Sequence, residues 1–296
     1  MTTIGFIGLG TMGHPMARHV LAARPGEVVL HTRTRGRVSD LLAAGARWAN
    51  TPADLARQCD MVVFVVPTIG DIRALMHGAD GLLAGVGAPL VLAVSSTCGA
   101  EEVRALGAEA DAASDGLVSV VDAPVSGGAE GAEAGTLSVM VGGPDAAAAL
   151  VVDVLSATGR AVHLGPLGSG QVAKACNQLI VAATVVANAE AAVVAERAGL
   201  DVAGLFDLLG GGYAGSRIMA VKARRFAEHD HSPSGAAKFL VKDLRAFAEV
   251  AADAGVATLL TEPLRSVFGG LTYAGLGDLD TAVVQRWIEQ GSDATA

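Results

Sequence analysis

The segment Ile4-Gly5-Phe6-Ile7-Gly8-Leu9-Gly10-Thr11-Met12-Gly13 decides the fold of this chain. Its first half is a short apolar run that predicts a buried strand over 3–7, and helical periodicity follows over 12–23. The turn between them carries the pattern G-x-G-x-x-G, formed by Gly8, Gly10 and Gly13. Between a strand and a helix, that pattern is typical of a dinucleotide-binding βαβ unit, where the helix N-terminus faces the pyrophosphate. The alternative is a glycine turn that holds no ligand.

Apolar runs of strand length alternate with helical segments through the first half of the chain. The further runs lie at 27–32, 61–66, 89–94, 118–121, 137–141 and 162–164. Such alternation predicts βαβ units and a mostly parallel, doubly wound sheet. After Gly168 the pattern becomes helical, over 170–199, 216–228, 234–254, 259–274 and 278–290. We therefore expect an α/β protein with a Rossmann-like dinucleotide-binding domain over 1–165. An all-helical domain for substrate binding and dimerisation would follow over 166–296, joined to the first by the long helix.

Composition excludes several classes of protein. The 296 residues are 51% hydrophobic and 17% charged, with a net charge of −9, so no basic surface for nucleic acid is expected. The apolar stretch from Leu179 to Val194 is interrupted by Asn188 and Glu190. We read it as too short and too polar for a membrane span and expect a buried helix.

The three cysteines, Cys59, Cys98 and Cys176, are widely spaced. They match neither a disulfide framework nor a set of metal ligands, so no metal site is expected. Free thiols suit a reducing compartment, and no signal peptide is visible at the N-terminus. These features favour a cytoplasmic protein.

The end of the second expected strand bears on the choice of nicotinamide cofactor. Enzymes that use NAD usually carry an acidic residue about 20 residues after the glycine loop, where it binds the ribose hydroxyls. Here the sequence is Leu30-His31-Thr32-Arg33-Thr34-Arg35, which has no acid and two arginines. Arginine suits a 2′-phosphate, so we favour NADP; the alternative is that both arginines are simply solvated.

Lysine is rare in this chain: only four of the 21 basic residues are lysines, and Lys174 is the first of them. An ammonium can lose its proton near neutral pH when it is desolvated, which a guanidinium cannot do. Lys174 precedes Asn177 and Gln178 by three and four residues, so all three share one face of the expected helix. The arrangement suits a proton donor beside two hydrogen-bonding amides. A solvated surface lysine is the alternative.

A second glycine-rich loop, Ser126-Gly127-Gly128, follows an expected strand. A serine followed by two glycines exposes a hydroxyl and backbone amides together, which suits a carboxylate. A plain glycine-rich turn is the alternative.

The chain resembles the β-hydroxyacid dehydrogenase family over nearly its whole length. The resemblance rests on five segments, at 5–17, 95–97 (Ser-Ser-Thr), 122–128 (Asp-Ala-Pro-Val-Ser-Gly-Gly), 168–178 and 239–244. It implies that Lys174 is the catalytic lysine and that the substrate carboxylate is bound by Ser126, Gly127 and Gly128, with Asn177 or Gln178 nearby. It also implies cofactor contacts from Gly8, Gly10, Thr11, Met12, Gly13, Thr32, Arg33, Thr34, Val66, Pro67, Thr97 and Lys242.

Two positions depart from the family pattern. The usual proline after Ser-Ser-Thr-x is absent, since Cys98-Gly99-Ala100 stands there, and Asp71 lies where some members have asparagine. Within the family, the run 127–143 is most similar to tartronate semialdehyde reductases.

The resemblance implies an NADP(H)-dependent oxidoreductase, with NAD possible, that interconverts a small 3-hydroxy or 2-hydroxy carboxylate and its semialdehyde. Examples are 3-hydroxyisobutyrate and tartronate semialdehyde. It also implies a homodimer or homotetramer. The alternatives are an imine reductase of the same fold and an NADPH-binding protein without catalysis.

Overall fold

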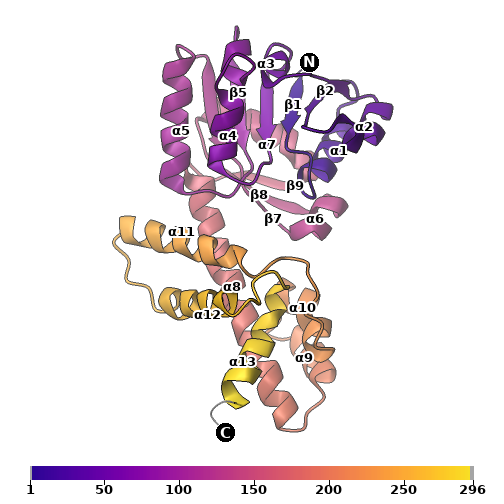
Figure 1. Ribbon diagram of the computed structural model, residues 1–296, viewed down its shortest axis with the longest axis vertical. Coiled ribbons are helices and arrows are strands. Elements are labelled where there is room, and N and C mark those ends of the chain that lie inside the picture. Colours follow the sequence, from indigo (N-terminus) through magenta and orange to yellow (C-terminus); the bar gives the residue numbers. More distant parts are fainter. Residues whose placement is uncertain (1, 294–296) are drawn as a thin grey trace. The chain divides into compact units, whose positions relative to one another are not determined.

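The computed structural model describes residues 2–293, which fall into two compact units, Met1–Lys174 and Ala175–Ala296 (Figure 1). Among the described residues, the first unit holds all the strands, and the second consists of helices joined by loops. This arrangement confirms the expected α/β fold with an all-helical C-terminal part.

The first unit is built on a six-stranded parallel sheet in the order β3-β2-β1-β4-β5-β6. Its strands are β1 (Ile4–Ile7), β2 (Val28–His31), β3 (Arg47–Trp48), β4 (Met61–Phe64), β5 (Leu90–Val94) and β6 (Val118–Asp122). The strand order reverses between β1 and β4, and ligands of doubly wound sheets bind at that point, outside the carboxyl ends of the strands.

Alternating side chains of this sheet enter two separate hydrophobic cores. Ile4 and Phe6 of β1 belong to one core, whereas Ile7 belongs to the other, and β4 divides in the same way. A strand sends successive side chains to opposite faces, so near-continuous apolar runs are needed where both faces are covered. The first core includes residues of α1 (Gly13–Ala23), α2 (Ser39–Ala43), α6 (Gly128–Ala134) and α7 (Asp145–Leu155). The second includes α3 (Pro52–Ala56), α4 (Ile69–Met76) and α5 (Ala100–Ala113).

The last strands of this unit form a second, three-stranded sheet. It consists of β7 (Val125–Ser126), β8 (Leu137–Val141) and β9 (Gly159–His163), with β7 antiparallel and β9 parallel to β8. The chain leaves the first sheet at Asp122, whose backbone pairs with Gly142 in an isolated antiparallel bridge. The runs at 137–141 and 162–164 were expected to be strands, but their separation from the main sheet was not visible in the sequence.

The second unit packs helices around a core of phenylalanines and small side chains. Its helices are α8 (Ser169–Arg197, of which the first residues belong to the first unit), α9 (Val202–Gly210), α10 (Arg217–Ala227), α11 (Phe239–Asp253), α12 (Thr261–Tyr273) and α13 (Val284–Asp293). Ala182, Val185 and Ala189 of α8 contribute to a core with Phe206, Phe226 and Phe268.

Helix α8 (Ser169–Arg197) agrees in length with the expected helix over 170–199, but its burial differs from the expectation. It runs for 29 residues, and by length and composition alone it could cross a membrane, so the reading "too short and too polar" is wrong. Only 39% of its most apolar stretch is buried, because side chains such as Ile180 and Val194 are about two-thirds exposed. The expectation of a buried helix is therefore met only in part: Ala182, Val185 and Ala189 are buried, whereas other apolar side chains of the helix are exposed.

Candidate active site

The glycine loop after β1 is packed tightly at two of its glycines and open at the third. A Cβ on Gly8, whose φ is +93°, would lie 2.3 Å from the carbonyl oxygen of Val65, and one on Gly13 would lie 2.0 Å from that of Gly8. At Gly10, a Cβ would meet no atom within 4 Å. The loop thus closes on the protein at Gly8 and Gly13 and leaves room for a ligand at Gly10.

The start of α1 suits an anionic ligand. The residue before the helix, Met12, makes no side-chain capping hydrogen bond, and the first turn contains no acidic residue. The first backbone N–H groups of a helix carry partial positive charge, which favours phosphate. Together with the open space at Gly10, this start fits a dinucleotide pyrophosphate.

The carboxyl end of β2 carries exposed basic side chains. Arg33 and Thr34 are exposed and Thr32 is half-buried. The guanidinium of Arg35 lies over the Trp48 ring, 5.4 Å from its centroid. The first acidic residue after β2 is Asp40, whose carboxylate pairs with His14 of α1 at 3.1 Å. The hydrogen bond to His14 holds the pKa of Asp40 below its usual value.

The loops after β4 and β5 are joined by the side chain of Ser96. Its hydroxyl donates to the carbonyl oxygen of Val66 at 2.6 Å and accepts from the Val66 N–H at 3.2 Å. The bond places the segment Val66-Pro67 beside the segment that contains Thr97, so two expected cofactor-binding segments are held next to each other.

Asp71 has a local structural role. Its carboxylate accepts hydrogen bonds from the backbone N–H of Thr68 at 3.0 Å and from the Thr68 hydroxyl at 2.7 Å. The Asp71 N–H in turn donates to the Thr68 hydroxyl, which completes a capping box at the start of α4. This explains an acid at a position that the sequence left unassigned.

The Ser126 loop follows β6 and begins the second sheet. Ser126 pairs with Ser138 of β8, and the backbone then turns through Gly127 and Gly128, whose φ angles are +137° and +65°. Residues that carry a Cβ rarely adopt positive φ angles of this size, so the turn favours glycine at both positions. The half-buried serine is therefore followed by two exposed backbone units, as carboxylate binding requires.

The start of α8 is anchored by Asp122, which is fully buried at the end of β6. Its two carboxylate oxygens accept from the backbone N–H groups of Gly168 and Gln171, each at 2.7 Å. Burial raises the pKa of Asp122 to about 6, although the backbone donors act in the opposite direction. Lys174 follows Gln171 by one helical turn and is only 8% exposed.

Four polar side chains of the second unit form a connected group. Asn177 donates to the side-chain oxygen of Gln178 at 2.9 Å, and Gln178 donates to Asp243 at 2.5 Å. The ammonium of Lys242 lies 3.4 Å from the other oxygen of Asp243. The structure therefore joins three expected site residues through the buried carboxylate of Asp243.

The expected site residues thus fall into two groups. Those of the first unit lie at the carboxyl ends of β1, β2, β4, β5 and β6 and at the start of α8, whereas Asn177, Gln178 and Lys242 belong to the second unit. The sequence assigned no role to Ser96, Asp122, Gln171 or Asp243. A signal existed for Asp122, because a carboxylate that ends a buried apolar strand requires compensating donors.

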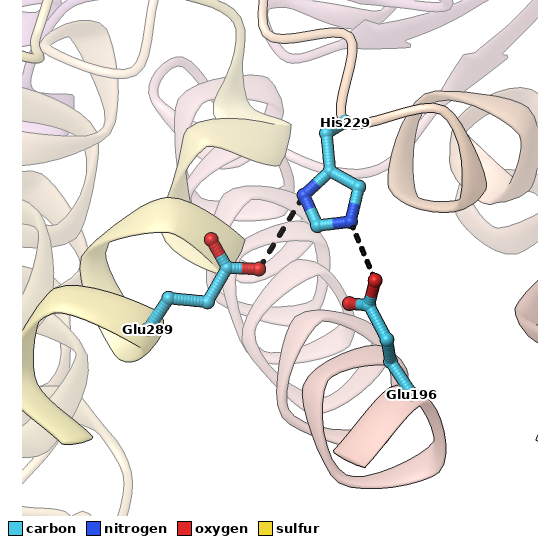
Figure 2. A group of neighbouring side chains, drawn as sticks. All are labelled: Glu196, His229 and Glu289. Atoms are coloured by element: carbon cyan, nitrogen blue, oxygen red, sulfur yellow. Dashed lines mark hydrogen bonds and ion pairs between the residues drawn. The ribbon is translucent and has the colours of Figure 1, made fainter. Parts of the chain in front are cut away.

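Another polar cluster lies outside these motifs. Figure 2 shows His229 between Glu196 and Glu289, with its ring nitrogens 3.1 and 3.4 Å from their carboxylates. The ligating atoms of the three residues all lie within 4.8 Å of one another, so they could also hold a cation. The geometry is equally that of a histidine held between two glutamates. The cluster ties α8 and α13 to the residues after α10.

Family models match both parts of the chain. The model described as the NAD binding domain of 6-phosphogluconate dehydrogenase matches residues 3–166. The model described as NAD-binding of NADP-dependent 3-hydroxyisobutyrate dehydrogenase matches residues 168–288.

Individual proteins are similar over almost the full chain. A probable 3-hydroxyisobutyrate dehydrogenase-like protein 3, mitochondrial, of Arabidopsis thaliana is 36% identical, over 94% of this chain and 84% of that protein. An NAD-dependent L-serine dehydrogenase of Pseudomonas aeruginosa is 32% identical, over 97% of each. The solved structure of Mycobacterium tuberculosis 3-hydroxyisobutyrate dehydrogenase with L-serine has a TM-score of 0.82 and 29% identity, over 97% of this chain and 99% of that one.

The fold and the site define a nicotinamide-dependent dehydrogenase. The chain belongs to the β-hydroxyacid dehydrogenase family, whose members are NAD(P)-dependent enzymes that act on CH–OH groups.

Proposed function

We propose that the protein interconverts a small 3-hydroxy carboxylate and its semialdehyde with NADP(H), and that Lys174 is the acid/base. The observation that carries the proposal is the burial of this lysine at the start of α8. It lies one turn after Gln171, whose side chain is hydrogen-bonded to the loop after β5. Lysine is almost never buried without a specific reason.

The chemistry divides between the cofactor and the chain. The glycine loop from Gly8 to Gly13 and the end of β2 would hold the dinucleotide, whose nicotinamide would supply the hydride acceptor or donor. As the alcohol is oxidised, Lys174 takes up the hydroxyl proton, and in reduction it donates that proton to the developing alkoxide. Ser126 and the N–H groups of Gly127 and Gly128 would hold the substrate carboxylate. A carboxylate fixed at one end orients the reacting carbon toward the nicotinamide.

The 3-hydroxy carboxylate class is supported by the relatives. One is named an L-serine dehydrogenase and a solved relative carries L-serine, which is itself a 3-hydroxy carboxylate. Others are named for 3-hydroxyisobutyrate. Ser126, with the two glycines that follow it, would bind the carboxylate that these compounds share.

The preference for NADP rests on the end of β2. Arg33 is exposed there, and the nearest following acid, Asp40, is engaged with His14. A guanidinium forms strong charge-assisted hydrogen bonds to phosphate. The P. aeruginosa relative is named as NAD-dependent, so the choice is open to measurement in this chain.

The proposal is tested with a panel of 3-hydroxyisobutyrate, L-serine, tartronate semialdehyde and succinic semialdehyde, followed by NADPH absorbance in both directions. We expect turnover of at least one member. We expect Lys174→Ala to lower kcat by about 10²–10⁴-fold, the range typical of a lost acid/base, with NADPH affinity nearly unchanged.

The matched control is Lys238→Ala, because Lys238 is exposed and paired with Asp278 at 2.5 Å. This variant should retain the kcat of the parent. Equal kcat in Lys174→Ala and the parent would contradict the assignment, and reduction of cyclic imines without any turnover of the panel would favour the imine reductase alternative.

A further inference from the structure

We infer that Gln171 is a positioning residue that sets the place of the Thr97 loop relative to Lys174. The inference rests on the proposed function for the identity of the reacting groups, but the contact itself is a property of the first unit alone. All residues involved lie within Met1–Lys174.

The side chain of Gln171 holds the β5 loop on both sides of Thr97. Its amide nitrogen donates to the carbonyl oxygen of Ser96 at 2.9 Å, and its amide oxygen accepts from the N–H of Cys98 at 3.1 Å. Gln171 is 2% exposed, so solvent does not replace these bonds easily. Both backbone groups that flank Thr97 are thereby fixed to α8.

The other end of this arrangement is fixed by Asp122. Gly168, which precedes α8, has no side chain to cap the helix, and the carboxylate from β6 supplies the missing acceptor for the N–H groups of Gly168 and Gln171. A Cβ on Gly142 would lie 2.5 Å from one carboxylate oxygen, and a Cβ on Gly170 would lie 2.8 Å from the other. The carboxylate is thus closely enclosed, and the backbone of Gln171 cannot shift along the helix axis without breaking its contact with β6.

The contacts continue to the loop after β4. Ser96 accepts from Gln171 through its carbonyl oxygen, while its hydroxyl exchanges hydrogen bonds with the backbone of Val66. The carboxyl ends of β4, β5 and β6 are therefore joined through one buried glutamine on α8. Lys174 lies one turn further along that helix. The position of its backbone is therefore fixed relative to the same three strand ends.

Such a connection has a functional consequence. Hydride transfer and proton transfer must occur on one substrate carbon and its oxygen, so the loop beside the nicotinamide and the acid/base lysine have to keep a fixed separation. A displacement of about 1 Å can cost about 10²-fold in rate. Loss of the Gln171 amide should therefore lower kcat much more than it weakens NADPH binding.

The test compares Gln171→Met with Gln285→Met. Gln285 is also a fully buried glutamine with two hydrogen-bond partners, the carbonyl oxygen of Phe226 and His231, but it lies in the second unit outside the site. Methionine has a similar length and removes both polar contacts in each case. The measurements are thermal unfolding, NADPH Kd, kcat and KM, and amide hydrogen exchange of the segment 95–99.

We expect Gln171→Met to lower kcat by 10- to 100-fold, to leave the NADPH Kd within about threefold, and to speed exchange in 95–99. Gln285→Met should keep kcat within about twofold, with exchange in 95–99 unchanged, even if both variants lose similar thermal stability. An unchanged kcat or unchanged exchange in Gln171→Met would overturn the inference, as would an equal loss of kcat in Gln285→Met.

A conservative variant gives a second readout, which also serves if Gln171→Met does not fold. In Gln171→Glu a protonated carboxyl can donate to Ser96 and accept from Cys98, whereas the ionised form repels the Ser96 carbonyl. The titratable groups next to this position are Asp122, which is bonded to its backbone, and Lys174, one helical turn away. The ratio of variant to parent kcat should rise from pH 8.5 to pH 6.5, and a flat ratio would contradict the inference. If the parent turns over no member of the panel, the proposed function fails while the exchange measurement still tests the contact.

Discussion

In the glycine loop, one substitution is expected to weaken cofactor binding without lowering the stability of the folded chain. Gly10→Ala places a methyl group where no protein atom lies within 4 Å, so the folded chain has room for it. Replacing glycine by alanine at a compatible position stabilises a protein by about 0.4–1 kcal/mol through the unfolded state. The same methyl group would stand between the backbone and a pyrophosphate. Loss of one hydrogen bond to a charged group costs about 1.5–3 kcal/mol, which corresponds to an increase of about 10- to 150-fold in the NADPH Kd.

Gly13→Ala should show the opposite pattern. Its Cβ would lie 2.0 Å from the backbone oxygen of Gly8 and 3.1 Å from the side chain of Val65. Forcing atoms into a packed site costs about 1–3 kcal/mol, which exceeds the gain of about 1 kcal/mol in helix propensity from glycine to alanine. The free energy of unfolding should therefore fall in this variant.

The assay is thermal unfolding of both variants without cofactor, followed by NADPH titration of the fluorescence of Trp48 and Trp287. We expect Gly10→Ala to match or exceed the parent Tm with weakened NADPH binding. Gly13→Ala should lose several degrees of Tm. A parent-like Kd in Gly10→Ala would refute the placement of the pyrophosphate. A larger Tm loss in Gly10→Ala than in Gly13→Ala would refute the reading of the loop.

Three further predictions concern the cofactor, pH and assembly. Arg33→Asp should reverse or flatten a preference for NADPH over NADH in kcat/KM, and an unchanged ratio would show that Arg33 does not contact the 2′-phosphate. The raised pKa of Asp122, about 6 in the folded state, means that the folded protein binds a proton that the unfolded chain releases. Its contribution to the free energy of unfolding, about 3 kcal/mol, is present below about pH 4 and lost as the pH rises through 6. Urea unfolding of the parent and Asp122→Asn should show this pH dependence in the parent only. The exposed apolar side chains of α8, including Ile180 and Val194, predict a dimer. Light scattering at micromolar concentration should give about twice the 29.6 kDa chain mass or a higher multiple. A stable, active monomer would contradict this prediction.

Local patterns in the sequence determined the architecture of this protein. Apolar runs of four to six residues that alternate with helical segments, such as Met61–Phe64, are typical of strands buried on both faces, because both alternating sets of side chains are apolar. The glycine spacing identified the turn from β1 to α1 in the first βαβ unit, since a Cβ does not fit at the closely packed positions of Gly8 and Gly13. The rarity of lysine is a property of composition alone, and it singles out Lys174 independently of the fold.

Features that depend on contacts between distant segments were not visible in the sequence. The second sheet arises where the chain turns away at Asp122, and α9 was not expected at all, although Asp201 caps it through the N–H groups of Ala203 and Gly204.

Only the tertiary structure decided which polar residues act together. Gln171 and Ser96 are 75 residues apart in sequence, and Asp122 and Gln171 are 49 apart, yet each pair is joined by a buried hydrogen bond. No local periodicity encodes such partners, because they are brought together by the strand order of the sheet. The sequence therefore determined which groups could bind a dinucleotide or move a proton, while the structure determined which buried bonds fix the loop at Thr97 and the start of α8.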